Sequence, residues 1–554
     1  MKNMKKQDKC RIFLTYGLAG LAAGTILAAP MAVSAAPAVP APGESIARPA
    51  VPDSKPVVEA DKAAAAAAPA GTTFQLQSVK VNHEGMKLKD AELKAITDTV
   101  LGKAINAAEL NKMVGKLTTY VRSHGYPAAI AYIPEQTAQA GNLTLNIEPG
   151  RFAKITIENG GVLQEKVAKG YLASLKQGDI IRTKKLEKSL RNLRDLPGVA
   201  VTASLSPGAE QGTSNLTVKI KDHDRDAYVL YAENYGSKAA GRYRYGLQAD
   251  WRNLSKLGDK LNVGGLISNN HQHGYNIGYE IPTGHSATVL GIGYSRSDYE
   301  LGGVFSQLGV EGKSDTVSLY GRTPLINSAA SGLNLVYAAN YRRLTDEIRG
   351  FEFGKRHSYG FSLGVDGRER TPESALLYNV TLHTGSLTPD SREADALATA
   401  GDTKGRFFKG TFDATGLQKL GGPFDVMLKL SGQKAASNLD SSEHIYLGGA
   451  KGVRAYPQGE ASGDEGILGT LELRYHTPVK GLIFSTYYDA GAVKAEKSRD
   501  GKTILKGWGL GLTYSKPNDY FARVDYARRI GWDDNLSNDA KSRQRVWFIV
   551  GKIF

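Results

Sequence analysis

Arg454 is the residue whose type and neighbours offer the most specific chemistry in this chain. It lies in the segment Val453-Arg454-Ala455-Tyr456, a few residues after Gly448-Gly449. A guanidinium is planar and always charged, and it can bind one carboxylate through two parallel hydrogen bonds. On the tetrapeptide alone, however, we favour a solvated loop arginine, whose exposed ion pair is worth only about 0–1 kcal/mol.

The patterns that mark enzymes and metal sites are weak. His271 and His273 lie in a predicted turn, where solvated histidines far outnumber metal ligands. Scattered Ser, His and Asp residues form no recognisable nucleophile motif, and no phosphate-cradling GxxxxGK(S/T) sequence occurs. We therefore predict that the protein is not an enzyme and that it uses no metal and no cofactor.

The elements that position these residues begin with a predicted export signal. Residues 1–35 combine five basic residues, an apolar stretch from Ile12 to Ala29 and the small residues Val33-Ser34-Ala35, which predicts a cleaved signal peptide. Its removal takes away Cys10, the only cysteine, which excludes disulfides and cysteine catalysis. Five positive charges and one negative charge leave with it, so the net charge falls from +15 to +11. This basic excess is spread along the chain, which argues against a nucleic-acid partner.

Residues 36–73 have the composition of a linker. Seven prolines stiffen the segment and oppose sheet formation. Within it, Val57 to Ala68 is rich in Ala and follows Pro56, which predicts a helix. A helix of about a dozen residues is marginal in isolation, so we expect it to need a docking site.

From residue 223 to residue 554, strand patterns take over. Tyr243, Tyr245, Leu247, Ala249 and Trp251 alternate with polar, charged or Gly residues, and similar segments recur as far as Phe554. An alternation of period two over such a length is typical of a transmembrane antiparallel β-barrel, with lipid outside and water inside. One membrane strand and its connection take about 20 residues, which predicts about 16 strands. The same alternation reconciles membrane residence with a mean hydropathy of −0.31.

Between the linker and the predicted barrel, residues 74–150 and 151–222 contain the same soluble plan twice. Each half reads as a strand, two amphipathic helices and two closing strands, a β-α-α-β-β order. In the first half, Asn106 and Glu109 predict a capping box at the start of the second helix. A repeated module ahead of a membrane barrel favours the handling of another chain over small-molecule chemistry.

Three stretches of the chain carry a resemblance to a known family. They are Leu193-Arg194-Asp195-Leu196-Pro197-Gly198-Val199, then Asn234-Tyr235-Gly236 with Gly241 to Gly246, and then Gly448-Gly449, Val453 to Tyr456 and Gly463-Asp464. Together they resemble the two-partner secretion transporters of the outer membrane, the haemolysin secretion/activation type. Each motif is weak to moderate alone, but their order is specific, and the resemblance covers about residues 74–554. It implies that the two repeats are polypeptide-transport-associated (POTRA) domains.

The third stretch resembles the loop that folds back into the lumen in this superfamily, here near residues 448–464. Tyr487, Asp489 and Gly491 resemble the facing strand of the barrel wall. The resemblance implies that Arg454 pairs with Asp489 inside the barrel. The sequence departs from the family at Ala455, where Gly is usual, and an Ala would be strained there if the position needed positive φ.

The C-terminus resembles the signal that the barrel-assembly machinery reads. Phe554 is the last residue, and Phe548 and Val550 precede it at alternate positions. Lys552 departs from the apolar residue expected between them and the end. A plain final strand explains the same residues.

The resemblance implies that the POTRA domains bind an unfolded exoprotein in the periplasm and that the barrel exports it. The expected partners are a large secreted protein of β-helical repeats, the barrel-assembly machinery and outer-membrane lipid. We further hypothesise that the linker helix plugs the lumen. Two alternatives remain open: an outer-membrane assembly factor that inserts other barrels, and a passive porin.

Overall fold

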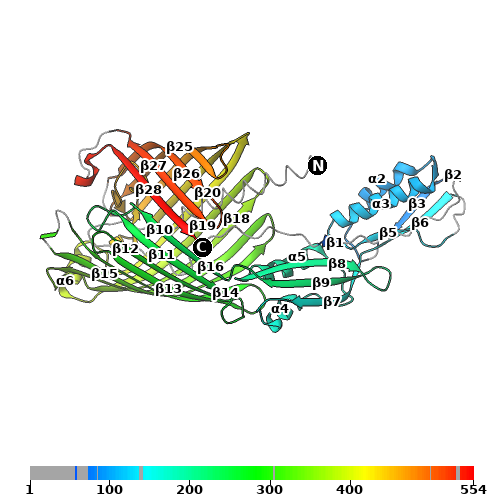
Figure 1. Cartoon of the computed structure of the whole chain (residues 1–554), viewed down its shortest axis with the longest axis horizontal. Coiled ribbons are helices and arrows are strands. Elements are labelled where there is room, and N and C mark those ends of the chain that lie inside the picture. The colour runs from blue at the N-terminus through cyan, green and yellow to red at the C-terminus, as the bar shows by residue number, and fades with distance from the viewer. Residues whose placement is uncertain are drawn as a thin grey trace. The chain divides into compact units, whose positions relative to one another are not determined.

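The computed structural model describes residues 57–58, 73–83, 85–136, 141–302, 306–307, 309–498, 501–531 and 537–554. Its described residues fall into two compact units, which are treated separately (Figure 1): one spans Pro52–His223 and the other contains Asp224–Phe554. The predicted signal peptide lies outside the described residues, as does the linker except for Val57 and Val58. No helix in the described part of the chain is both long enough and apolar enough to cross a membrane.

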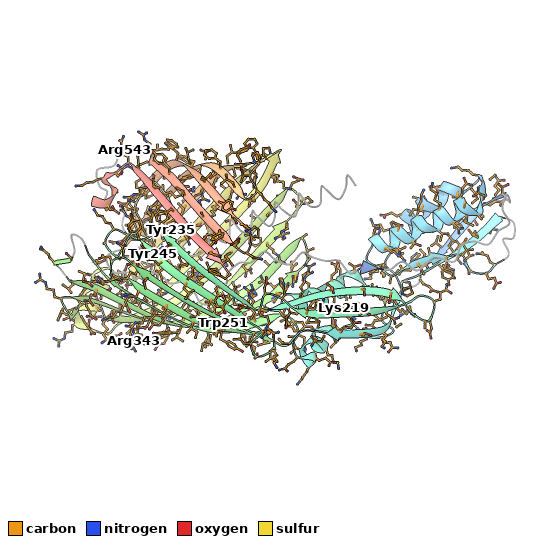
Figure 2. All side chains as sticks on the ribbon, in the orientation of Figure 1. Lys219, Tyr235, Tyr245, Trp251, Arg343 and Arg543 are labelled. Atoms are coloured by element: carbon orange, nitrogen blue, oxygen red, sulfur yellow. The ribbon has the colours of Figure 1, made fainter. Side chains whose placement is uncertain are left out.

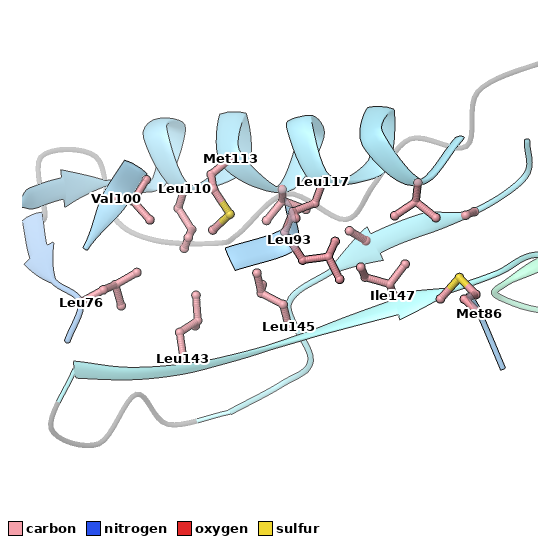
Figure 3. Close-up of a cluster of buried hydrophobic side chains, with 14 of the residues drawn as sticks. Leu76, Met86, Leu93, Val100, Leu110, Met113, Leu117, Leu143, Leu145 and Ile147 are labelled. Atoms are coloured by element: carbon pink, nitrogen blue, oxygen red, sulfur yellow. The ribbon is translucent and has the colours of Figure 1, made fainter. Parts of the chain in front are cut away.

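The first repeat is built around helix α3, which packs its apolar face on the sheet β3-β6-β5 (Figure 3). Asn106 and Glu109 form the predicted capping box: the Asn106 side chain accepts from the Glu109 amide at 2.9 Å, and the Glu109 carboxylate accepts from the Asn106 amide at 3.0 Å. Leu110, Met113 and Leu117 are buried below it. The elements are β2 (Thr73–Gln75), β3 (Ser78–Asn82), α2 (Asp90–Thr97), η1 (Asp98–Val100), β4 (Ala104–Asn106), α3 (Ala107–Ser123), β5 (Ile130–Tyr132) and β6 (Asn142–Glu148).

The second repeat has the same order of strand, two helices and two strands. Its elements are β7 (Arg151–Asn159), α4 (Glu165–Leu172), α5 (Thr183–Arg194), β8 (Val199–Pro207) and β9 (Thr213–Asp222). In its sheet, β9 lies between β7 and β8, so β8 would be an open edge in the repeat by itself.

That edge is occupied by residues of the linker. Val57 and Val58 form strand β1, which pairs in parallel with Ser204 and Leu205 of β8. The predicted helix from Val57 to Ala68 is therefore wrong at its first two residues, and its remainder lies outside the described residues. Two β-branched residues next to an unpaired strand gain more from sheet pairing than from a marginal helix.

Within the described residues, sixteen long strands close an antiparallel barrel, as predicted, and the two-residue β17 extends the hairpin of β16 and β18. Trp251 on β11 and Arg343 on β16 are labelled in Figure 2. The strands are β10 (Asp226–Glu233), β11 (Arg244–Arg252), β12 (Lys260–Ser268), β13 (His273–Thr283), β14 (Thr288–Glu300), β15 (Val310–Asn327), β16 (Ser331–Ile348), β17 (Phe351–Glu352), β18 (Arg356–Arg370), β19 (Ser374–Pro389), β20 (Gly405–Gly421), β21 (Phe424–Ala435), β24 (Glu465–His476), β25 (Leu482–Lys494), β26 (Thr503–Ser515), β27 (Tyr520–Arg529) and β28 (Gln544–Ile553).

Alternation along each strand separates the two surfaces of the wall. On β11, Tyr245 and Leu247 are exposed on the outside, whereas Arg244, Gln248 and Asp250 are buried on the inside. This arrangement is the one expected for an apolar outer belt around a polar lumen.

Glycines on one strand repeatedly face an aromatic ring on the next. Tyr231 lies directly opposite Gly246, and its ring covers the place where a Cβ would stand. Tyr320 and Gly291 make the same pair between β15 and β14. The missing side chain lets the ring lie flat along the wall, as in the aromatic rescue of glycine in sheets.

The barrel closes where its first strand meets its last. Five residues of β10, Val229 to Glu233, pair with β28. The Asn234 side chain prolongs this seam, because its amide donates to the Val546 carbonyl at 2.8 Å and accepts from the Phe548 amide at 2.7 Å.

We call the rim at which β10 begins the near rim and the opposite one the far rim. The connections β16–β18 and β19–β20 lie at the far rim, and the second contains helix α6 (Arg392–Ala400). The connection between β21 and β24 also starts there, and it is the longest of the described connections in the barrel.

Candidate functional site

Residues 436–464, between β21 and β24, form the lumen loop, which turns back inside the barrel. It contains η4 (Ser441–Glu443), β22 (Ile445–Tyr446) and β23 (Ser462–Gly463). Its tip, residues 448–456, is compact, because the Gly452 amide donates to the Gly449 carbonyl at 3.0 Å and the Val453 amide to the Leu447 carbonyl at 2.7 Å. The tip contains the four residues Val453 to Tyr456 that the sequence singled out.

One side of the tip, together with Leu447 just before it, is apolar and packs on the inner wall. Leu447, Val453, Ala455 and Tyr456 are buried against Tyr487, Val493, Leu505 and Ala527 of β25, β26 and β27. The absence of a side chain at Gly491 lets Leu447 pack against the wall, since a Cβ there would lie 2.9 Å from the Leu447 side chain. Apolar burial therefore holds the loop in the lumen alongside its polar contacts.

The structure places Arg454 directly on Asp489. The guanidinium donates to the two carboxylate oxygens through Nε at 2.9 Å and Nη2 at 2.8 Å, and the Arg454 amide donates to the same carboxylate at 3.1 Å. Thr470 on β24 donates a further hydrogen bond to Asp489 at 2.9 Å. Arg454 is only 5% exposed and Asp489 is fully buried, so this is a desolvated, fork-like ion pair rather than a solvated loop contact.

Two more carboxylates and a second arginine complete the cluster, and the sequence analysis did not assign them a role. Arg454 Nη1 lies 3.1 Å from Asp525 and 3.4 Å from Glu472. Arg523 binds both of these carboxylates, at 2.7 Å and 3.0 Å. The signal that could have found them is the alternation, because Glu472 and Asp525 are charged residues at buried, inward positions of β24 and β27.

The barrel also holds Arg454 by its backbone and by its flat face. Trp547 on β28 donates from its indole nitrogen to the Arg454 carbonyl at 2.7 Å. The Tyr487 ring lies beneath the guanidinium, with 3.1 Å from the Arg454 Cζ atom to the ring centroid. Arg454 is thus bound by residues of four strands, β24, β25, β27 and β28.

The backbone at Ala455 is not strained, although the family usually has Gly at this position. Ala455 is not among the described residues with positive φ, so a Cβ is compatible with its backbone. Its methyl group instead points at β26, where it meets Gly507.

A second set of ion pairs holds the base of the lumen loop near the far rim. Asp440 accepts from Arg356 of β18 at 2.9 Å, and Arg356 also binds Asp346 of β16 at 2.7 Å. Glu443 of η4 lies 2.9 Å from Arg342 and 2.8 Å from Lys409. The loop is therefore fastened at its base as well as at its tip.

These contacts change the pKa values of the two carboxyl groups at the base of the loop. Burial alone would raise the pKa of the Asp440 carboxyl, but the Arg356 guanidinium outweighs that effect, so the pKa lies below its usual value. Burial likewise opposes ionisation of Glu443, and Lys409 and Arg342 together hold the pKa of that carboxyl below its usual value. Both groups are therefore charged at neutral pH and available as acceptors.

Two cavities border the tip of the loop. One of about 100 Å³ is lined by Arg454, Glu472 and Arg523 together with Lys429. The other, of about 320 Å³, is lined by Gly448, Gln458 and wall residues that include Asp413. Charged side chains therefore border the space that the loop leaves beside it in the lumen.

The C-terminal residues lie at the seam on the outer wall. Val550 and Phe554 are exposed on the outside, and the Phe554 amide donates to the Tyr228 carbonyl of β10 at 2.9 Å. Phe548 shares their outward row on β28. The Lys552 ammonium lies 4.9 Å from the Phe554 ring centroid and 4.7 Å from that of Tyr520, so its charge is accommodated over aromatic faces.

Sequence comparison finds relatives along most of the chain. The family described as haemolysin secretion/activation protein ShlB/FhaC/HecB matches residues 212–514, and the ShlB-type POTRA domain matches residues 74–150. The heme/hemopexin transporter protein HuxB of Haemophilus influenzae is 28% identical over 501 residues, which cover 87% of this chain and 88% of HuxB. The outer membrane transporter CdiB of Dickeya dadantii is 24% identical over 458 residues, 80% of each chain.

Solved structures share the fold. CdiB from Escherichia coli matches with a TM-score of 0.69 at 19% identity, over 91% of this chain and 94% of that one. BamA from Haemophilus ducreyi lacking POTRA domains 1–3 matches with a TM-score of 0.54 at 14% identity, over 87% of this chain and all of that one. At these identities the likeness concerns the arrangement of strands and helices.

Proposed function

This chain belongs to the haemolysin secretion/activation protein family ShlB/FhaC/HecB, and we propose that it binds an extended segment of its exoprotein at the edge of β8 and exports it past the lumen loop. It is an outer-membrane transporter of two-partner secretion that acts with a secreted exoprotein, and its POTRA region lies in the periplasm. Residues 223–225 lead from β9 to β10, so the near rim faces the periplasm and the far rim faces the outside of the cell. We propose residues 74–150 and 151–222 as the two POTRA domains and 223–554 as the barrel.

The observation that carries the capture step is the pairing of β1 with β8. An edge strand offers unpaired backbone donors and acceptors, and an extended chain of almost any sequence can satisfy them. The chain's own Val57 and Val58 already use this edge, and in the described part of the chain β1 consists of these two residues. A longer exoprotein segment makes more backbone hydrogen bonds than β1 and displaces it.

The passage step requires the lumen loop to move, because its tip is buried in the lumen and bonded to the wall. We propose Val453, Arg454, Ala455 and Tyr456 as the lumen-loop motif that holds the resting state, with Asp489 and Gly491 as its partners on the wall. The sequence contains no nucleotide-binding loop, so folding of the emerging exoprotein outside the cell supplies the direction. We propose no catalytic role for any residue.

Two further partners belong to the same proposal. The outward aliphatic and aromatic residues of the strands contact outer-membrane lipid. Phe548, Val550 and Phe554 on the outward row of the last strand are the signal for the barrel-assembly machinery. The exoprotein itself is proposed to be a large protein of β-helical repeats.

The function is tested by finding what the periplasmic unit retains. Immobilised residues 52–223 are incubated with periplasmic extract of the source cell, and the retained proteins are identified by mass spectrometry. One large secreted protein is expected. A mixture of unfolded barrel precursors would instead indicate an assembly factor, and a reproducible blank would favour a porin.

The place of capture is tested by site-specific photo-crosslinking in the full-length protein. A photo-reactive residue replaces Ser204 on β8 or, as a matched control, Thr217 on β9. These two residues are direct cross-strand partners, but β9 is covered on both sides by β8 and β7. Cross-links to the exoprotein are expected at position 204 well above those at position 217, and equal yields at the two positions would refute binding at this edge.

A further inference from the structure

The inner face of β26 is bare opposite the tip of the lumen loop. Gly507, Gly509 and Gly511 occupy three successive inward positions of this strand, between the outward Lys506, Trp508, Leu510 and Leu512. We call these three residues the glycine strip. Each of them stands where a group of the Arg454 cluster approaches the wall.

Gly507 makes room for the tip itself. A Cβ at this position would lie 2.6 Å from the Ala455 Cβ, and real Cβ atoms do not approach other carbon atoms so closely. The Ala455 methyl group, which is buried, therefore occupies the space that a side chain on Gly507 would take.

Gly509 and Gly511 make room for two groups that bind Arg454. Gly509 lies directly opposite Tyr487, and a Cβ there would lie 2.4 Å from the ring on which the guanidinium stacks. A Cβ on Gly511 would lie 2.9 Å from the Asp525 carboxylate, which accepts from Arg454 Nη1. The strip thus determines how near the wall both Arg454 and its partners can sit.

We propose that Gly507 is a positioning residue of the lumen loop and forms a matched pair with Ala455, so that together they set the depth at which Arg454 meets Asp489. Carbon atoms in contact lie about 3.5–4.0 Å apart, so a methyl group on Gly507 would push Ala455 away by about 1 Å. Arg454 is the preceding residue, and its bonds to Asp489 at 2.8 and 2.9 Å would lengthen beyond hydrogen-bonding distance. This inference rests on the proposed role of the lumen loop.

The test reads the position of the loop directly. Val453→Cys, in a Cys10→Ala background, leaves one thiol in a fully buried position of the tip, and its labelling rate with a membrane-impermeant maleimide follows the fraction of released loop. The reporter is combined with Gly507→Ala, with Ala455→Gly, and with both changes. Gly416→Ala on β20 is the matched control, because a Cβ there meets nothing within 4 Å. Heat-modifiable migration on gels verifies that each barrel has assembled.

Gly507→Ala is expected to raise the labelling rate about ten-fold or more, as overpacking of a tight contact does. Adding Ala455→Gly is expected to bring the rate back to within a few-fold of the parent, because the new methyl group then lies 3.7 Å from the Cα atom of residue 455. Gly416→Ala should label like the parent. An unchanged rate in Gly507→Ala would overturn the proposal.

Rapid labelling in both Gly507→Ala and the double variant would also overturn it, because the methyl group would then act elsewhere, for example on the Arg528 carbonyl 3.2 Å away. If Gly507→Ala fails to assemble, the double variant decides: assembly with the parental rate supports the pair, and failure of both refutes it. Export of the exoprotein is measured in parallel. If the double variant has the parental labelling rate but export is unchanged in every variant, the pairing of Gly507 with Ala455 is supported and the proposed role of the loop in export is refuted.

Discussion

Replacing Arg454 with Ala should release the tip of the lumen loop while the barrel remains assembled. The change removes a cation from three buried carboxylates. Arg523 still binds Asp525 and Glu472, but Asp489 loses its guanidinium partner. Removing one partner of a buried ion pair costs about 3–5 kcal/mol. At about 1.4 kcal/mol for each factor of ten, the ratio of seated to released loop falls by about two to three and a half orders of magnitude. Arg454→Lys keeps the charge but loses the two parallel hydrogen bonds of the guanidinium, so its ratio of seated to released loop should lie between those of the parent and Arg454→Ala.

The assay is maleimide labelling of the Val453→Cys reporter, with export of the exoprotein measured in the same cells. We expect labelling at least 100-fold faster in Arg454→Ala and a sharp loss of export. Lys404→Ala is the control, because Lys404 and Asp395 form an exposed pair 2.6 Å apart on another far-rim connection, and such a pair is worth about 0–1 kcal/mol. Equal labelling of the parent and Arg454→Ala would refute the reasoning, since the apolar contacts and the backbone hydrogen bonds of residue 454 would then hold the tip without the guanidinium.

Three further changes probe other parts of the molecule. Leu117→Ala, in the centre of the first repeat, should lower the free energy of unfolding of residues 52–223 by about 2–5 kcal/mol in urea denaturation, and a change under 1 kcal/mol would contradict its place in the core. Asn106→Ala removes the cap of α3 and should cost about 1 kcal/mol in the same experiment, whereas an unchanged midpoint would mean that the capping box contributes nothing. The pKa of Asp440 in the folded protein is below that of a free Asp carboxyl. The stability that its ion pair gives to the seated loop is therefore complete above the pKa of the unfolded chain, about 3.9, and is lost as the pH falls through the folded pKa. Labelling of the Val453→Cys reporter, normalised to the unfolded chain at each pH, should therefore stay constant from pH 8 to about 5, and a rise near pH 6 would argue against this account.

Features that repeat locally could be predicted from the sequence. The alternation seen around Tyr245 predicts a membrane strand wherever it occurs, so the barrel and its sixteen strands follow from a pattern within single segments. The capping box at Asn106 likewise depends on four consecutive residues, from Asn106 to Glu109. The proximity of Arg454 and Asp489 could not be predicted from their spacing, because they are 35 residues apart. It was predicted from the resemblance to a family.

The other members of the cluster could not be predicted, because they come together only through strand register. Asp525 and Trp547 lie 71 and 93 residues from Arg454, and their contacts depend on which residues of β25 to β28 stand side by side. A shift of one residue in any of these pairings would turn Asp525 to the lipid side. The strand at Val57 was missed for a related reason, since its helical propensity was outweighed by an open edge that local sequence does not reveal.

The bonds that seat the lumen loop also bear on the order of events in biogenesis. Arg454 is held by Asp525 on the penultimate strand and by Trp547 on the last strand, and that last strand is also the one that closes the seam with β10. The tip cannot be fully bound until the end of the chain has been delivered and paired with residues more than 300 positions earlier. The last strand therefore serves both steps, and the tip acquires its complete set of bonds only when the strand that seals the cylinder is in place.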